Sequence, residues 1–349
     1  MTLLILETKT STEDIQIGGI YWKRLRMDRQ IGVYLRAAQQ MGMDVHGIGY
    51  DVIGRPQLRP YKATPVESRK YTKPTKTEPS RLYANQRDRD EAPEEYGARC
   101  LAAIVAEPDA YYQRGIPIRL FREQHDCAVD VWQTAGAIRD ARRLNVFPRN
   151  PDACFTWNRS CDYLSVCSGD VPIDDPLLFR REESAHEELE EVFETDRTVL
   201  TQSCMRTYQA CARRYKHRYI DRARPRVQSG ALRGGSSVHR GVEWLRKGAT
   251  LEDACTKLDR EDPYDYERER AMLVGYVARW GDPARGIVAV EKEFEIDLVN
   301  PETGASSRTF RLAGKMDALF DGDERDFLGA GPRAGSTPAA GAEVVNDGH

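Results

Sequence analysis

The first ten residues, MTLLILETKT, place a short apolar run directly before a charged pair, and they predict a buried strand with a polar end. Alternate side chains of a strand point the same way, so Glu7 and Lys9 share one face. A carboxylate and an ammonium held side by side can bind a divalent cation and steady an attacked phosphate. A surface ion pair explains the same two residues, and the motif is too common to decide alone.

Strand-like and helix-like segments follow this opening strand. Apolar residues recur at helical spacing over 21–42, which predicts one helix with Gln30 and Tyr34 on the same face. Partial alternation predicts a strand over 45–53. The same reading continues with a helix over 92–106, a strand over 116–121 and a helix over 128–144.

A second compact segment is predicted over 200–328. It begins with a strongly basic helical stretch. A Gly-Gly break and a Ser N-cap candidate then place His239 in the first turns of a helix. We expect a further helix over 264–280 and a β-hairpin with its turn at 300–304, and Asp317 falls on the second strand of that hairpin.

Three other segments are polar or low in complexity. Residues 57–92 are rich in Lys, Arg, Thr and Pro, which predicts an extended surface excursion. Residues 171–199 are dominated by Asp, Glu and Arg and predict an acidic linker with a solvated helical piece. Residues 329–349 are rich in Gly, Ala and Pro and are expected to be disordered.

The composition is that of a globular protein. It is 40% hydrophobic and 31% charged, and no stretch resembles a membrane span or a signal peptide. We therefore expect a cytoplasmic protein with no membrane partner. The formal net charge of −3 does not exclude a polyanion partner, because a local basic patch can bind nucleic acid.

Residues 206–226 form such a patch, with eight basic side chains against the single acid Asp221 and with tyrosines interleaved. Basic and aromatic side chains together predict a path for single-stranded DNA. A solvated amphipathic helix has the same composition. The residues expected to bind DNA are Arg213, Arg214, Tyr215, Lys216 and Arg218.

Three of the eight cysteines, Cys154, Cys161 and Cys167, lie close together in the sequence. Buried thiols that serve as small hydrophobic side chains need no such grouping. The C-x₆-C-x₅-C spacing does not match the closely paired ligands of a zinc ribbon. Irregularly spaced thiolates suit a [4Fe–4S] cluster, and zinc and free thiols remain as alternatives.

Taken together, these motifs resemble the RecB/AddB-type branch of the PD-(D/E)XK nuclease superfamily. The resemblance implies a restriction-endonuclease-like α/β core, a mixed sheet of about four strands flanked by helices. Iron–sulfur members of that branch have one cysteine near the family N-terminus and three near its C-terminus. Here Cys211 and the cluster of three occupy the corresponding places. The matching motifs are Glu7-x-Lys9, Gln30-x-x-x-Tyr34, His239 and Asp317.

The resemblance also implies a metal site. Asp317 and Glu7 would be its main ligands, and His239 would add an imidazole nitrogen. Oxygen and nitrogen ligands together suit Mg²⁺ or Mn²⁺. Glu291 or Glu293, on the first strand of the hairpin, could assist these ligands.

Three further residues receive roles from the same resemblance. Lys9 would orient the attacking water or stabilise the transition state. Gln30 and Tyr34 would brace the site and touch the nucleic-acid backbone. Taken singly, each of them is also explained as an ordinary surface or core residue.

The order of the motifs departs from that of the family, in which the His and Asp segments come first. Here residues 1–170 resemble the family's second half and residues 200–328 its first half, with 171–199 as the linker. The chain therefore resembles a circularly permuted nuclease. Residues 326–328 resemble the beginning of the strand that Met1 re-enters, so this strand must insert beside that of Asp317.

These features predict a metal-dependent DNA nuclease. We expect an exonuclease that acts on single-stranded ends. By resemblance, its setting would be DNA repair or recombination, in a phage or mobile element and with a helicase or recombination partner. The rival hypotheses are a catalytically inactive nucleic-acid-binding protein and a non-functional product of a rearranged reading frame.

Overall fold

A computed structural model describes residues 3–75, 79–117, 121–156, 159–187, 189, 196–227 and 230–329. Two expectations lie wholly or partly outside these ranges. They are the disorder of the C-terminal tail beyond Gly329 and residues 118–120 of the strand predicted over 116–121. None of the described helices is long and apolar enough to cross a membrane.

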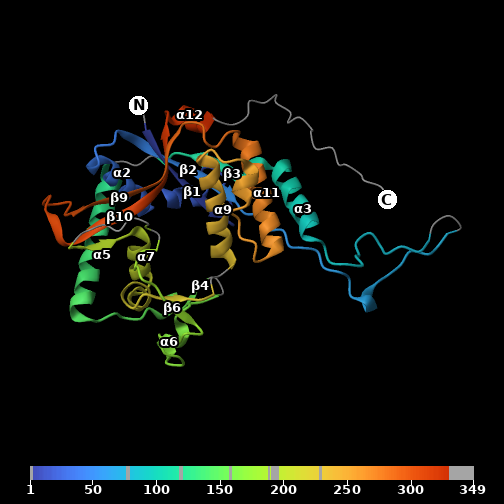
Figure 1. The fold of residues 1–349 in the computed structure, drawn as a ribbon, viewed down its shortest axis with the longest axis horizontal. Coiled ribbons are helices and arrows are strands. Elements are labelled where there is room, and N and C mark those ends of the chain that lie inside the picture. Colours follow the sequence, from blue (N-terminus) through green and yellow to red (C-terminus); the bar gives the residue numbers. More distant parts are fainter. Residues whose placement is uncertain are drawn as a thin grey trace.

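A mixed sheet forms the centre of this α/β fold, with helices on both of its faces (Figure 1). Six strands belong to it within the described ranges, rather than the expected four. Their order is β3-β2-β1-β10-β7. β1 and β7 pair with different parts of one edge of the long strand β10, and β9 pairs with its opposite edge. The strands are β1 (Leu3–Ser11), β2 (Val45–Gly54), β3 (Tyr112–Gly115), β7 (Thr198–Leu200), β9 (Ile287–Val299) and β10 (Ser306–Asp321).

The opening strand lies in the middle of this sheet. β1 runs parallel to β2 and antiparallel to β10, with Leu6 opposite Ala318. This confirms that the strand of Glu7 inserts beside that of Asp317. The consecutive side chains Leu4, Ile5 and Leu6 are all buried, as expected for a strand covered on both faces.

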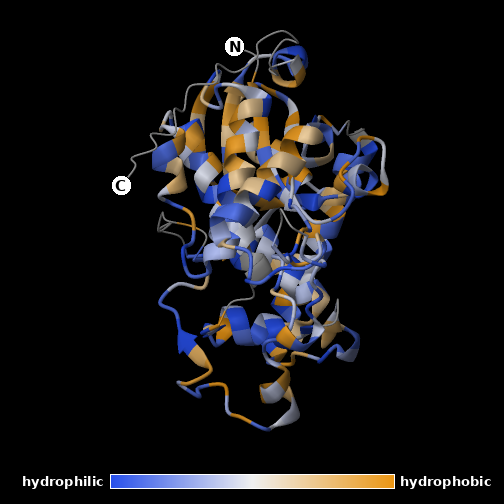
Figure 2. Ribbon diagram, turned by 90° about the vertical axis from the view of Figure 1, so that its right-hand side faces the viewer, coloured by the Kyte–Doolittle hydropathy of each residue, from blue (hydrophilic) through white to orange (hydrophobic). Residues whose placement is uncertain are grey.

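Helices α1 (Ile20–Leu25), α2 (Arg29–Gln40), α5 (Phe121–Leu144) and α7 (Gln202–Ala210) contribute to one core against the sheet. The single helix predicted over 21–42 is wrong, because it is broken between α1 and α2. Asp28 is the reason: its carboxylate accepts a hydrogen bond from Gln30 N at 3.0 Å and begins α2 as an N-cap. Figure 2 shows hydrophobic residues gathered in this body of helices and strands.

Helices α3 (Pro93–Ala106), α9 (Gly230–Arg246) and α11 (Pro263–Trp280) form a second core. The Gly-Gly pair was expected to precede the helix of His239, but α9 begins before it. Gly234 lies inside the helix, at a point where α11 passes close by. A Cβ at Gly234 would come within 2.8 Å of Glu269 Oε1.

The strand predicted to begin at residues 326–328 is wrong, because this segment belongs to α12 (Glu324–Gly329). Asp323 Oδ1 accepts a hydrogen bond from Asp326 N, and Phe327 packs its ring against Phe320. These contacts turn the chain into a helix at the end of β10.

The predicted acidic linker contributes β6 (Phe179–Arg181), which pairs with β8 (Ala223–Pro225), and β7 lies at its end. The remaining short elements are η1 (Val66–Ser68), α4 (Pro108–Tyr111), η2 (Pro151–Ala153), β4 (Phe155–Thr156), β5 (Arg159–Ser160), α6 (Leu164–Ser168), α8 (Ala212–Tyr215), the π-helical turn η3 (Lys216–Ile220) and α10 (Leu251–Cys255).

Candidate metal centre and active site

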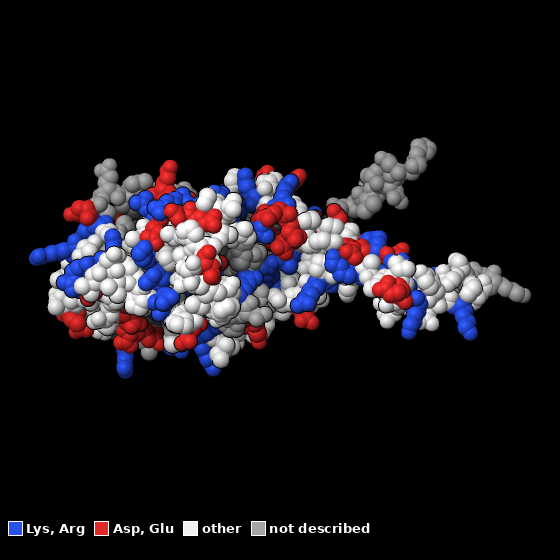
Figure 3. Space-filling model, turned by 90° about the horizontal axis from the view of Figure 1, so that it is seen from below, with Lys and Arg blue, Asp and Glu red and all other residues white. Residues whose placement is uncertain are grey.

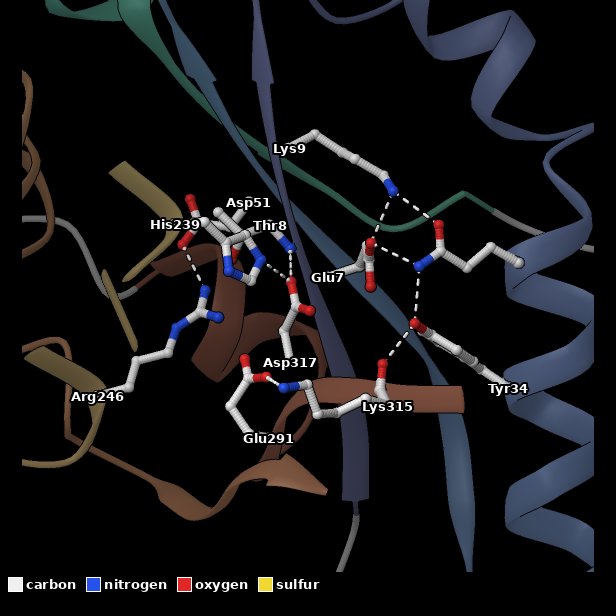
Figure 4. Close-up of polar contacts among 11 residues, drawn as sticks. Glu7, Thr8, Lys9, Tyr34, Asp51, His239, Arg246, Glu291, Lys315 and Asp317 are labelled. Atoms are coloured by element: carbon white, nitrogen blue, oxygen red, sulfur yellow. Dashed lines mark hydrogen bonds and ion pairs between the residues drawn. The ribbon is translucent and has the colours of Figure 1, made fainter. Parts of the chain in front are cut away.

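The candidate site lies where β1 and β10 separate. Their pairing ends at Leu6 and Ala318, and one residue further along β1 the polar residues begin. Beyond this point Thr8 N donates to Asp317 Oδ2 at 2.7 Å, so the backbone of β1 is hydrogen-bonded to a side chain of β10 rather than to its backbone. This contact fixes the Asp317 carboxylate between the strands (Figure 4).

Three side chains converge at this point from three elements. His239 Nε2 lies 2.8 Å from Asp317 Oδ2, and possible ligand atoms of His239, Glu291 and Asp317 all lie within 4.8 Å of one another. Within the described ranges this is the group of His, Cys, Asp and Glu close enough to hold one metal ion. Two carboxylates and an imidazole suit Mn²⁺, or Mg²⁺ with added water.

Glu291 reaches the site through an unusual backbone conformation. Its φ of 54° places it in the left-handed region, although it lies within β9 and is not a glycine. Such strain costs roughly 1–3 kcal/mol and tends to occur at functional sites. Lys315 Nζ holds the Glu291 carboxylate at 2.6 Å.

Glu7 and Lys9 form a second part of the site with the helix α2. Lys9 Nζ donates to Glu7 Oε1 at 2.6 Å and to Gln30 Oε1 at 2.7 Å. Gln30 Nε2 donates to Glu7 Oε1 at 2.8 Å and to Tyr34 OH at 2.7 Å. Tyr34 OH in turn donates to Lys315 O at 2.6 Å, which ties α2 to β10. The structure therefore brings all four predicted residues together, and their catalytic roles remain predictions.

The buried Glu7 carboxylate fits a cation. Glu7 is only 4% exposed, and its Oε2 has no hydrogen-bond partner among the described residues. Burial, followed by the charge of Asp317, raises the pKa of Glu7 to about 7. Glu7 is not in the group whose ligand atoms lie within 4.8 Å of one another, whereas Glu291 is, and the ligand roles of both residues remain predictions.

His239 and Asp317 favour each other's charged forms. Burial acts to lower the pKa of His239, but the adjacent Asp317 carboxylate outweighs it and the pKa rises to about 9. Burial likewise opposes ionisation of Asp317, and His239 holds the pKa of that carboxyl below its usual value. A bound cation would replace the imidazolium charge beside Asp317.

A buried ionic network behind the site was not predicted from the sequence. Asp51 is fully buried on β2, opposite Thr8, and it lies 3.2 Å from Arg114 Nη2 and 3.3 Å from Arg246 Nη2. Tyr276 OH also donates to Asp51. This network joins α9 and α11 to the sheet, so it helps to hold His239 toward Asp317.

The four predicted cluster ligands lie in one neighbourhood. Asn150 Nδ2 donates to Ala210 O at 2.9 Å, which joins the segment of Cys154 to that of Cys211. Burial and then the neighbouring thiols Cys161, Cys211 and Cys154 raise the pKa of Cys167. All four thiols are partly exposed, whereas the other four cysteines are buried. No three of the four lie together within 4.8 Å in the described chain, which is wider than a preformed single-zinc site.

The predicted DNA-binding residues mostly contact protein. Arg213 Nε donates to Phe147 O at 2.9 Å, and Lys216 Nζ lies 2.7 Å from Asp221 Oδ1. Tyr215 is 2% exposed and its ring stacks on that of Phe147. Its ring therefore offers no open face to a base in this structure. Arg214 and Arg218 are half-buried, and the DNA-binding role of this patch remains a prediction.

Comparison with known families adds one finding to this geometry. The model of the PD-(D/E)XK nuclease superfamily matches residues 199–328. No curated protein and no solved structure matches the chain. The matched segment contains His239, Glu291 and Asp317, and it ends before the tail. Residues 199–328, which carry the candidate metal ligands, thus match the PD-(D/E)XK nuclease superfamily.

Proposed function

We propose that this protein is a divalent-metal-dependent deoxyribonuclease that hydrolyses DNA from single-stranded ends. The observation that carries the proposal is the convergence of two distant segments. The family-matched segment supplies His239, Glu291 and Asp317, and β1 supplies Glu7 and Lys9 from outside that match.

The chemistry needs an activated water and neutralisation of charge on the phosphate. A divalent cation, when bound, supplies a Lewis acid and a water of lowered pKa. His239, Glu291 and Asp317 would hold it, and the unpaired Oε2 of Glu7 would face it. Because the pKa of Glu7 is about 7, this carboxyl can also exchange a proton near neutral pH.

Lys9 would act on the substrate. Its ammonium is fixed by Glu7 and Gln30, and burial is outweighed by the charge of Glu7, so its pKa lies above the usual value. A charged ammonium in this position can orient the attacking water or stabilise a phosphate oxygen in the transition state. Gln30 and Tyr34 keep the pair in register with β10.

The test is degradation of end-labelled single-stranded DNA with Mn²⁺, Mg²⁺ or EDTA. Cleavage should need the metal, and Lys9→Ala and Asp317→Ala should each lower its rate by at least a hundredfold. Glu302→Gln, at the exposed hairpin turn, is the matched control and should leave the rate unchanged. A circular single strand distinguishes exonuclease from endonuclease action, since only an endonuclease cuts it.

A catalytically inactive nucleic-acid-binding protein is the second candidate. It is favoured by the segment order, in which the Glu7-x-Lys9 strand stands before rather than after the Asp317 strand. DNA binding without cleavage at any metal concentration would select it. Metal-dependent cleavage that persists in Lys9→Ala at the wild-type rate would instead indicate a contaminating nuclease.

For the cysteines we propose a structural [4Fe–4S] cluster held by Cys154, Cys161, Cys167 and Cys211. Support comes from the proximity of the four partly exposed thiols and from a spacing too wide for a preformed zinc site. Anaerobically purified protein should contain iron and acid-labile sulfide, and Cys211→Ser should lose both. Stoichiometric zinc in place of iron would overturn the cluster.

A further inference from the structure

A long basic arm leaves the sheet beside the candidate site. It comprises residues 55–91, between β2 and α3, and it projects away from the body in Figure 1. β2 ends with Gly54 opposite Ser11, and Arg55 N donates to Ser11 O at 2.7 Å. Because Ser11 lies two residues beyond Lys9 on β1, the arm begins at the catalytic end of the sheet.

The two legs of the arm are held together by cross-leg hydrogen bonds. Backbone pairs join Thr64 to Arg87, Lys70 to Tyr83 and Thr72 to Arg81, each at 2.8–3.1 Å. At its base, Glu91 Oε2 accepts from Tyr61 N at 2.8 Å. Arg99 Nη2 on α3 also lies 2.7 Å from Glu91, and its guanidinium stacks on Tyr61. The two legs of the arm are therefore paired with each other, and their base is fixed to helix α3.

The outer part of the arm is basic, although the whole chain has a net charge of −3. Residues 68–87 contain six Lys and Arg against one acidic residue. Lys70 and Lys73 are exposed, and neither forms an ion pair with any residue that the structure describes. Figure 3 shows Lys and Arg side chains projecting from this extension.

Exposed aromatic rings accompany this charge. Tyr71 is 53% exposed and Tyr83 is 46% exposed, on opposite legs of the arm. Exposed tyrosines interleaved with lysines are typical of surfaces that bind single-stranded nucleic acid. The lysines bind the phosphates, and the bases stack on the tyrosine rings.

We propose that the described legs of the arm, residues 62–75 and 79–90, bind a single-stranded stretch of nucleic acid continuous with the strand held at the metal centre, an inference that rests on the proposed nuclease function. The arm projects away from the body (Figure 1), so it can contact only nucleotides beyond those at the metal centre. Short substrates end before they reach it.

The experiment measures the affinity of the full-length protein for labelled single strands of 8 and 30 nucleotides, with Ca²⁺ in place of Mn²⁺ to suppress cleavage. Lys70→Ser/Lys73→Ser and Tyr71→Ser/Tyr83→Ser should each weaken binding of the 30-mer about tenfold and that of the 8-mer less than twofold. The lysine variant should also reduce the slope of log affinity against log salt by roughly 1.4.

Arg139→Ser/Arg143→Ser is the matched control, because it removes two exposed cations from α5, across the molecule from the arm (Figure 1). It should change neither affinity by more than twofold. Unchanged 30-mer binding in both arm variants overturns the proposal, as does an equal loss for the 8-mer. An arm variant that changes only the oligomeric state would also overturn it, in favour of contact between copies of the chain.

The outcome separates the arm from the nuclease proposal. Hydrolysis of the 8-mer should proceed at the wild-type rate in both arm variants, because the metal centre is intact. If the arm variants lose 30-mer binding and the wild-type protein never hydrolyses DNA, the arm proposal stands and the nuclease proposal is rejected. If the protein hydrolyses DNA normally and the arm variants bind the 30-mer unchanged, the nuclease proposal stands and the arm proposal is rejected.

Discussion

Glu291 was predicted only to assist the metal ligands, but it lies within the candidate metal group. It lies in a left-handed conformation opposite Asp317, whereas Glu7 is held on its other side by Lys9 and Gln30. The strain at Glu291 is maintained because Lys315 anchors its carboxylate. A strained acidic side chain beside a second acid favours a metal site, and a bound cation would compete with Lys315 and His239 for these two carboxylates.

We therefore predict that Glu291→Gln weakens Mn²⁺ binding by about 10- to 100-fold, since a neutral amide replaces a charged ligand. Isothermal titration calorimetry on the protein without DNA measures this directly. Glu302→Gln, which removes an acid from the exposed turn of the same hairpin, should leave the affinity unchanged. Equal affinities for wild type and Glu291→Gln would show that Glu291 is not a ligand.

Metal affinity should also rise with pH. Cations bind the ionised form of Glu7, whose pKa burial and Asp317 raise to about 7, and the neutral form of His239, whose pKa is about 9. Protons therefore compete most at low pH, and affinity should fall by up to tenfold per group for each unit below these values. Titrations at pH 6, 7 and 8, in buffers of different ionisation enthalpy, report both the trend and the released protons. An affinity independent of pH would contradict it.

The sequence identified Glu7, Lys9, Gln30, Tyr34, His239 and Asp317 as residues that meet, because each lies in a recognisable short motif. It placed Glu291 only as a possible assistant. The reason lies in the register of the hairpin, which is irregular between Ser306 and Arg311. Counting back from the turn would pair Asp317 with Val288, and only the shifted register brings Glu291 opposite it.

At the scale of elements, helix boundaries depended on tertiary contacts. The strands β1 and β2, helices α3 and α11 and the hairpin were predicted because apolar spacing and turn residues marked them. The Gly-Gly pair in α9 was misread as a helix start, since local rules treat glycine as a break. What keeps glycine at position 234 is the close passage of α11, which a local pattern does not contain.

This packing predicts opposite effects for two glycines inside helices. Gly234→Ala places a Cβ 2.8 Å from Glu269 Oε1, so the buried end of this flexible side chain must shift, and the variant should be destabilised by about 1 kcal/mol. Gly136→Ala in α5 meets no atom within 4 Å and should stabilise it by about 0.5–1 kcal/mol. Chemical denaturation monitored by circular dichroism gives both values. A stabilising Gly234→Ala would show that α9 and α11 can separate without cost.

At the scale of the whole molecule, the sheet joins the two ends of the described chain. β1 pairs with β10, and α9 carries His239 over them from a third part of the sequence. Sequence order predicted that residues 1–170 and 200–328 are two halves of one fold, and the central strand of the sheet lies outside the family-matched segment. Strand pairing over such a separation leaves no local signal, so the motifs indicated it only jointly.

This topology predicts that the matched segment is not an independent unit. A fragment of residues 196–329, which keeps β7 whole, would lack β1 and expose both the edge of β10 and the apolar faces that Leu4, Leu6 and Ile5 cover. We expect it to show no cooperative thermal transition and no Mn²⁺ binding. Coexpression with residues 1–195 should restore both, because Glu7 and Lys9 then return beside Asp317. The control is the full chain cut by an inserted protease site between residues 195 and 196, which should bind Mn²⁺ as the intact protein does. A fragment that folds alone with full metal affinity would mean that β1 is an accessory strand and that the candidate metal centre is complete without it.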